Sequence, residues 1–412
     1  MRNRLKFVTM LASICAVGAL SGAAVAADQG PQVSKATAKT LKAAQDALKE
    51  KKLDEALTHL KEAQQIPERT PYDNFVINQD LLYIYVQKQD YTAAAPILES
   101  TAQSQYATPD QQKTWLKALF AIDYQQKDYP KTVDIGEQLI KRGITDSETL
   151  STIADSQNKL GKFKDAAATV DQIISHQEKP EEKLLLFQWS MYDKSKDQAD
   201  GGRVLERLVG LYPKPEYWQN LLVSLANMDT KDSHLKLNVY RLQNDVGVLK
   251  RPADFGDMAE IALDAGFPGE TVAVLEEGFQ KNVFGDQREK DRYQHLLDGA
   301  KQRAAADQQA LGKSEPVDGN AYVQRGAAYL SYGQYDKAIA DITKGIQKGG
   351  LKSIDEANLY LGMAELRSKN NAEAQHTFDK VAQSSNPGYA RLGKLWALHA
   401  GQRTGSAVAS AN

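Results

Sequence analysis

Apolar and polar positions follow a helical period along most of the chain, and the pattern is clearest between Tyr322 and Lys348. Two amphipathic segments stand there on either side of the short sequence Tyr332-Gly333-Gln334. Their apolar positions recur every three or four residues, at Tyr322, Gly326, Tyr329 and Leu330 in the first and at Tyr335, Ala338, Ile339, Ile342 and Ile346 in the second. The pattern predicts two helices joined by a tight turn.

The same helix pair recurs along the chain, and a small side chain in the second helix marks each copy. Two helices of a hairpin approach closely only where a side chain is short, with larger neighbours filling the gaps around it. The candidate anchor residues are Ala56, Ala94, Thr132, Ala166, Gly201, Leu235, Thr271, Ala305, Ala338 and Ala374. Leu235 breaks the small-residue rule, and Gly201 is placed mainly by register. A period of about 35 residues predicts an all-α solenoid, a superhelix of about ten helix hairpins.

The repeated pieces resemble the tetratricopeptide repeat (TPR) family. Leu160-Gly161-Lys162-Phe163-Lys164-Asp165-Ala166 and Gly333-Gln334-Tyr335-Asp336-Lys337-Ala338 match its hairpin turn and the small residue that follows. Shorter matches stand at Lys52 to Ala56, Gln89 to Tyr91 and Lys127 to Tyr129, and the resemblance extends from about residue 33 to 400. It implies a superhelix whose inner wall is formed by the first helix of each repeat, where partner peptides bind.

The resemblance also implies a set of groove residues, carried over position by position. They are Gln79, Tyr83, Val86, Lys117, Tyr124, Gln125, Leu186, Gln219, Val223, Val323, Leu330, Leu359 and Met363. Tyr83 and Tyr124 are the expected anchors for a partner, through ring burial and one hydroxyl bond. For Val323, Leu330, Leu359 and Met363 the alternative is packing between repeats, because a register error of one residue rotates a helical side chain by about 100°.

Three further segments suggest a closer resemblance, to exported repeat proteins encoded beside TonB-ExbB-ExbD energy-transduction genes in Proteobacteria. The segments are 211–218, 266–279 and 348–362, and they occur in the same order as in that group. This resemblance implies a partner within TonB-dependent transport or another envelope protein.

The first 27 residues have the pattern of a secretory signal peptide. Arg2, Arg4 and Lys6 precede an uncharged stretch that ends with small residues at Ala24 and Ala26. An uncleaved membrane anchor is the alternative, since the stretch is just long enough to span a bilayer. Cys15 does not fit a lipid acceptor, because Ile14 stands where a small residue is needed. We expect cleavage and a periplasmic location in a Gram-negative bacterium.

Further divisions follow from composition. We expect an N-terminal block of repeats over 33–303, a degenerate repeat end or hinge loop over 304–319, and C-terminal repeats with a capping helix over 320–400. The capping helix carries Tyr389, Leu392, Leu395 and Trp396 on one face. The Gly-, Ser- and Ala-rich segment 401–412 is expected to be a disordered tail.

Charge and motif searches exclude several functions. Lys and Arg number 51 against 53 Asp and Glu, a net of −2, with no block of like charges that would favour nucleic acid. The 6 histidines lie in separate repeats without metal-ligand spacing, and Cys15 lies within the signal segment. Gly312-Lys313-Ser314 resembles the end of a phosphate loop, but Asp307 stands where its first glycine belongs. We therefore expect no cofactor, no metal and no catalysis.

The sequence thus predicts a periplasmic scaffold that binds a partner protein in the concave groove of a TPR superhelix. The alternative is a structural envelope-assembly component that associates with copies of itself through its ends or edges.

Overall fold

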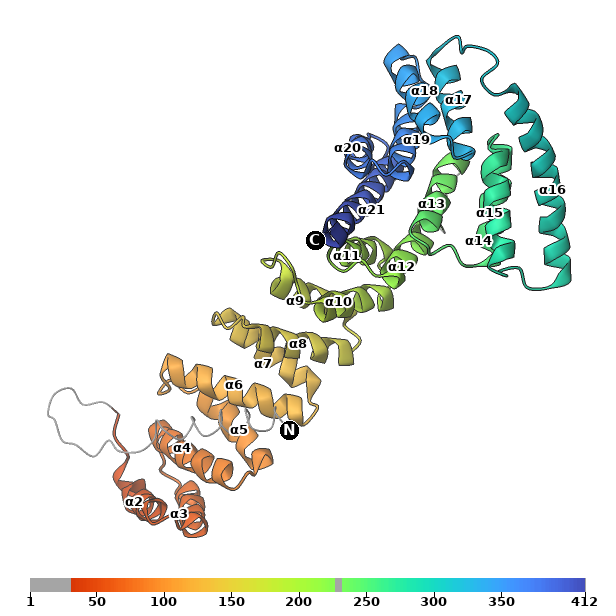
Figure 1. Ribbon diagram of the computed structural model, residues 1–412. Coiled ribbons are helices and arrows are strands. Elements are labelled where there is room, and N and C mark those ends of the chain that lie inside the picture. Colours follow the sequence, from red (N-terminus) through yellow and green to blue (C-terminus); the bar gives the residue numbers. More distant parts are fainter. Residues whose placement is uncertain (1–30, 227–231, 412) are drawn as a thin grey trace. The chain divides into compact units, whose positions relative to one another are not determined.

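The computed structural model describes residues 31–226 and 232–411, with the side chains of 226 and 405–411 excluded. Every regular element in these ranges is an α-helix, as the repeat pattern predicted. The chain divides into two compact units, Met1–Lys196 (unit 1) and Asp197–Asn412 (unit 2). Figure 1 traces the helices of both. Those of unit 1 are α2 (Lys35–Lys49), α3 (Leu53–Gln65), α4 (Pro71–Gln87), α5 (Tyr91–Ala102), α6 (Pro109–Gln125), α7 (Tyr129–Lys141), α8 (Ser147–Lys159), α9 (Phe163–Ile174) and α10 (Glu182–Lys194).

Unit 2 begins with α11 (Gln198–Leu211) and ends with the long helix α21 (Pro387–Ala411). The helices between them are α12 (Pro215–Ala226), α13 (Ser233–Asp245), α14 (Pro252–Asp264), α15 (Pro268–Gln280), α16 (Gln287–Ala310), α17 (Gly319–Ser331), α18 (Tyr335–Lys348), α19 (Ile354–Arg367) and α20 (Asn371–Val381). The predicted segment 1–27 lies outside the described residues. Among the described helices, none is both long and apolar enough to cross a bilayer.

One turn conformation recurs in front of the anchors. Five positions before each of eight anchors, the backbone adopts a φ between 57° and 83°, at Lys51, Gln89, Lys127, Gly161, Lys196, Gly266, Gly333 and Lys369. This left-handed residue ends the first helix, and the next amide usually donates to a carbonyl five residues back, as Asp90 does to Tyr85 (2.9 Å). The Asp90 and Asp128 side chains then cap the following helix. A regular turn therefore spaces the hairpins.

The predicted anchors are confirmed at these eight positions. All of them are buried, namely Ala56, Ala94, Thr132, Ala166, Gly201, Thr271, Ala338 and Ala374. Leu235, which broke the small-residue rule, is only half-buried. Ala305 is exposed near the end of α16, so its choice as an anchor was wrong. Ala305 was expected in the second helix of a hairpin, but Gln287–Ala310 form a single helix of 24 residues.

Enlarging a buried anchor should destabilise its hairpin. Ala166→Leu places extra methyl groups at a site with no exposed surface, beside Ala167 and Met191. We expect unit 1 to lose about 1–3 kcal/mol of unfolding free energy, measured by urea unfolding followed by circular dichroism. Ala168→Leu is the matched control, because Ala168 is exposed on the same helix. Equal stability of the two variants would argue against anchor packing.

About half of the hinge predicted over 304–319 is helix. Ala304 to Ala310 belong to α16, since alanine and glutamine are strong helix formers, and only 311–318 form a connection. The Tyr332 hydroxyl donates to Asp307 Oδ2 at 2.7 Å, which ties α16 to the end of α17. The chain instead divides into its two units after Lys196.

In unit 2, helices from the start and the end of the unit lie together. Arg391 Nε on α21 donates to Glu206 of α11 at 2.7 Å, and Gln402 donates to the carbonyl of Val209 at 2.9 Å. In Figure 1, α21 passes beside α13, which it contacts. Repeats in an open solenoid contact only their neighbours, so the described part of unit 2 departs from this pattern where α21 contacts α11 and α13.

The expected capping helix is confirmed, but its length is not. Tyr389, Leu392, Leu395 and Trp396 are all buried on α21. The helix then continues to Ala411, where a disordered tail was expected from residue 401. Gln402 contacts α11, and Arg403 contacts Asp245 of α13, so the start of that segment is held by tertiary contacts that the sequence does not announce.

Candidate functional site

Polar side chains link successive first helices of unit 1. Gln45 Nε2 on α2 lies 3.5 Å from Asp80 Oδ2 on α4, and the Tyr124 hydroxyl on α6 donates to Asp155 Oδ2 on α8 at 2.8 Å. Lys194 Nζ on α10 donates to Asn158 Oδ1 on α8 at 3.1 Å. These six side chains stand 7 to 14 positions before their anchors, and Gln79, Tyr83 and Lys117 stand 11 to 15 positions before theirs, at spacings that fall on one helix face. We call the set the first-helix surface: Gln45, Gln79, Asp80, Tyr83, Lys117, Tyr124, Asp155, Asn158 and Lys194.

Tyr124 is the exposed aromatic of this surface. Its side chain is 37% exposed, whereas most large apolar side chains of the described chain are buried. The Tyr129 ring meets it edge to face at 6.2 Å, and Asp155 holds its hydroxyl. Burial and the bond to Asp155 raise the pKa of Tyr124 to about 12, so the hydroxyl stays protonated at neutral pH. The ring is therefore fixed in orientation before any partner arrives.

The other groove candidates of unit 1 differ in accessibility. Tyr83 is half-buried and packs against the core cluster built around Leu41, Leu60 and Ile84, and Val86 is buried. Lys117 Nζ lies 3.9 Å from Asp146 Oδ2, and its side chain is partly exposed. Gln79 and Leu186 are half-buried, and Gln125 is exposed. Their role in partner binding stays a prediction.

The candidates of unit 2 lie mainly in its core. Leu330, Leu359 and Met363 are buried, and the last two have no exposed surface. The side chain of Val323 points toward Gly345 of α18, where an added Cβ would lie 2.8 Å from Val323 Cγ2. Leu330, Leu359 and Met363 are thus buried as the core-packing alternative expected, and Val323 is half-buried. Helix α21 packs against α19, and a role of these four residues in partner binding stays a prediction. Gln219 and Val223 on α12 are half-buried.

Sequence reasoning missed a buried arginine cluster in unit 2. Arg241 on α13 makes two bonds to Glu270 of α15, from Nε at 2.8 Å and from Nη2 at 2.6 Å. Its guanidinium lies between the rings of Phe267 and Tyr360, 5.0 and 5.2 Å from their centroids. A third bond joins Nη1 to Asn238 Oδ1 at 2.8 Å. The residues that contact Arg241 come from α13, α15 and α19, so no local sequence motif predicts the cluster.

Asp245, at the end of α13, forms a second cluster. It accepts from His399 Nε2 at 2.8 Å and lies 3.3 Å from Arg403 and 3.6 Å from Arg367. Burial alone would raise the pKa of Asp245, but these three neighbours hold it below its ordinary value. Asp245 therefore joins α13 to both α19 and α21.

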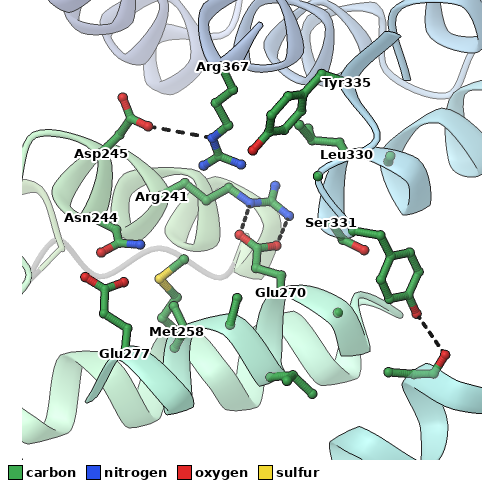
Figure 2. A pocket seen from close by; sticks show the side chains of 18 of the residues that line it. Arg241, Asn244, Asp245, Met258, Glu270, Glu277, Leu330, Ser331, Tyr335 and Arg367 are labelled. Carbon is green, nitrogen blue, oxygen red and sulfur yellow. Dashed lines mark hydrogen bonds and ion pairs between the residues drawn. The ribbon is translucent and has the colours of Figure 1, made fainter. Parts of the chain in front are cut away.

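A cavity of about 670 Å³ lies beside these clusters, entirely within unit 2. Figure 2 shows Arg241, Asp245, Glu270, Tyr335 and Arg367 around it. Within the described residues, no group of His, Cys, Asp and Glu is arranged to hold a metal ion. Asp307, where a phosphate loop would need glycine, instead accepts the bond from Tyr332.

Comparison with known proteins gives fold-level likenesses only. No protein-family model matches the chain, and no curated protein sequence matches it. A tetratricopeptide repeat protein from Parabacteroides merdae is 14% identical, with 80% of this chain and 99% of that chain covered and a TM-score of 0.28. The maize pentatricopeptide repeat protein PPR10 is 12% identical over 88% of this chain and 61% of its own, with a TM-score of 0.26.

The TPR2AB domain of yeast Sti1, in complex with an HSP90 peptide, is 14% identical over 88% of this chain and 97% of its own, with a TM-score of 0.23. The hairpins, the shared left-handed turn and the buried anchors of this chain make it an all-α fold of the tetratricopeptide type.

Proposed function

We propose that this chain is an exported, non-catalytic scaffold that binds a partner protein on the first-helix surface of unit 1. The single observation that carries the proposal is Tyr124, an exposed aromatic ring held in place by Asp155 and Tyr129. Exposed aromatics with a polar end are enriched where proteins bind one another, because they combine apolar area with one directional bond.

The surroundings of Tyr124 suit a segment of polypeptide. Asn158 and Lys194 extend the surface from α8 to α10, and Lys194 Nζ lies 5.4 Å from the centroid of the Phe163 ring. Asp80, whose pKa burial raises to about 6 against the bond from Gln45, extends it toward α2. A surface whose side chains already bond to one another loses little conformational entropy on binding, which favours affinity.

The location and the partner class in this proposal rest on the sequence. The signal-like segment 1–27 supports export to the periplasm. The resemblance of 211–218, 266–279 and 348–362 to repeat proteins encoded beside TonB-ExbB-ExbD genes supports a partner in TonB-dependent transport or a nearby envelope protein. Self-association through ends or edges stays the alternative, and light scattering that shows a monomer at all concentrations would remove it.

Removing the Tyr124 ring should weaken partner capture. We expect Tyr124→Ala to reduce the affinity for the native partner by about 1–3 kcal/mol, as for other interface aromatics, with unchanged circular dichroism. Tyr124→Phe keeps the ring but loses the bond to Asp155, so we expect a smaller loss. The measurement is quantitative pull-down from an envelope extract followed by titration with the captured protein.

Two further variants control this experiment. Glu137→Ala changes an exposed residue on α7, the second helix of the same hairpin, and should leave capture unchanged. Tyr83→Ala should also weaken capture, but it removes a side chain that packs on the core, so its stability must be measured alongside. Equal capture by the wild type and by Tyr124→Ala would exclude Tyr124 as an anchor.

A further inference from the structure

The cavity of unit 2 has no part in the proposed protein-binding surface, which lies on unit 1. Its wall combines α13 and α15 with α17 and α19. Single residues or pairs from α14, α16, α18 and α21 also line it, among them Met258, Tyr335 and Arg403. A volume of about 670 Å³ lies within the range of small-molecule sites. The residues that line the cavity come from segments far apart in the sequence, between Arg241 and Arg403. The cavity therefore forms where these segments pack together within unit 2.

Three arginines line this cavity, and one of them, Arg403, lies 3.3 Å from Asp245. The guanidinium groups of the other two differ in how firmly they are held. Arg241 is buried and fixed by Glu270 and Asn238, whereas the side chain of Arg367 is 25% exposed. Among the described residues, Arg367 makes one ion pair within 4 Å, from its Nε to Asp245 at 3.6 Å, and its charge also acts on Glu270. Figure 2 shows Arg367 and Tyr335 reaching from α19 and α18 toward Arg241. The terminal nitrogens of Arg367 are thus available to a planar, bidentate acceptor.

The acidic side chains of the wall are already engaged. Glu270 takes both bonds from Arg241, and Asp245 meets His399 and Arg403 as well as Arg367. Glu276 pairs with Lys301 at 2.8 Å and Glu277 with Lys281 at 2.5 Å. The three arginines of the wall, together with Lys281 and Lys301, make five cations against the four carboxylates of the wall. Each carboxylate is thus paired, and an added anion can bond to the terminal nitrogens of Arg367.

Apolar side chains line the rest of the wall. Met258, Val274, Ala327 and Leu330 are buried residues that contribute to it, beside the ring of Tyr335. An apolar wall next to a guanidinium matches a molecule with one charged end and an apolar body.

We propose that this cavity binds a small organic anion, with its carboxylate or phosphate on Arg367 beside Arg241 and its apolar body against Met258, Leu330 and Tyr335. The guanidinium of Arg367 supplies the directional bonds. The pair formed by Arg241 and Glu270 supplies a rigid floor, since breaking it would leave a buried charge unpaired.

The test uses the full chain and three probes of one shape. Benzoate presents a carboxylate and phenyl phosphate presents a phosphate, each on a phenyl ring. Benzamide is the neutral counterpart of benzoate. Isothermal titration should show saturable binding of at least one anion and at least about tenfold weaker binding of benzamide. The anion that binds more tightly shows whether the site prefers a carboxylate or a phosphate. Absence of saturable binding by both anions, or equal binding of benzamide, would overturn the proposal.

Variants locate the binding. Arg367→Gln should weaken the binding of the more tightly bound anion by about 10- to 100-fold. Ala273→Trp should block the site, because Ala273 is an exposed residue of the wall and the indole would occupy the cavity. Arg292→Gln is the matched control, since Arg292 is an exposed arginine of α16 that pairs with Glu260 outside the wall. Thermal melting of each variant shows that it is folded. Unchanged anion binding by folded Arg367→Gln would also overturn the proposal.

Discussion

Replacing Arg241 by methionine is expected to lower the unfolding free energy of unit 2 by about 3–5 kcal/mol. The Arg241 side chain is 4% exposed and that of Glu270 is 11% exposed. Removing the guanidinium leaves a buried carboxylate without its bidentate partner and empties the space between Phe267 and Tyr360. Chemical unfolding followed by tryptophan fluorescence, together with hydrogen exchange of α13, α15 and α19, measures the loss.

A double variant distinguishes the unpaired charge from lost packing. Arg241→Met with Glu270→Met removes both charges and should recover most of the stability, since apolar replacement of a buried pair is often neutral. Arg292→Met, at an exposed ion pair on α16, should change stability by less than about 1 kcal/mol. An Arg241→Met protein as stable as the wild type would show that the pair does not hold these helices together.

The effect of pH on this pair has a defined sign. Burial alone would raise the pKa of Glu270, but Arg241 holds it below its ordinary value of 4.5. The contribution of the pair is therefore present above that value and is lost as the pH falls below it.

Replacing Trp396 by alanine is expected to cost unit 2 about 3–5 kcal/mol of unfolding free energy. The Trp396 side chain has no exposed surface and stacks on Phe378 at 5.3 Å between ring centroids. It also meets His399, which bonds to Asp245 of α13, so the cavity left by the indole lies next to the link between α21 and α13.

The readout for Trp396→Ala is hydrogen exchange resolved by helix, together with urea unfolding. We expect faster exchange in α20 and α21 and also in α13, because these helices are joined through His399 and Asp245. Lys394→Ala, at an exposed position on the same helix, is the matched control and should match the wild type. Loosening confined to α20 and α21 would contradict the link to α13.

Local packing could be predicted from the sequence because it repeats. Each hairpin brings one short side chain against its partner helix, so eight buried anchors were readable from spacing alone. The left-handed turn before them was visible where glycine occupies it, as at Gly161 and Gly333. Lysine occupies the same conformation at Lys127 and Lys369, where the residue type alone does not predict a left-handed turn.

Contacts between distant segments could not be predicted in this way. Arg241 and Glu270 stand 29 positions apart, and Arg391 and Glu206 stand 185 apart. Nothing in a repeat pattern specifies which repeats meet when a unit closes. Leu359 and Met363 lie in the core of unit 2, whereas Tyr124, in unit 1, is exposed. The anchor predicted at Ala305 was wrong for a similar reason, since Ala305 is exposed. A small residue indicates a close contact only where a partner helix lies beside it.

The most direct test of the account is photocrosslinking in cells from the first-helix surface. A photoreactive amino acid at position 124 or 158 should give a covalent adduct with one envelope protein, identified by mass spectrometry. The same amino acid at position 137, on α7, should give none. Absence of an adduct from both surface positions, or equal adducts from position 137, would contradict the claim that the first helices of unit 1 bind a partner.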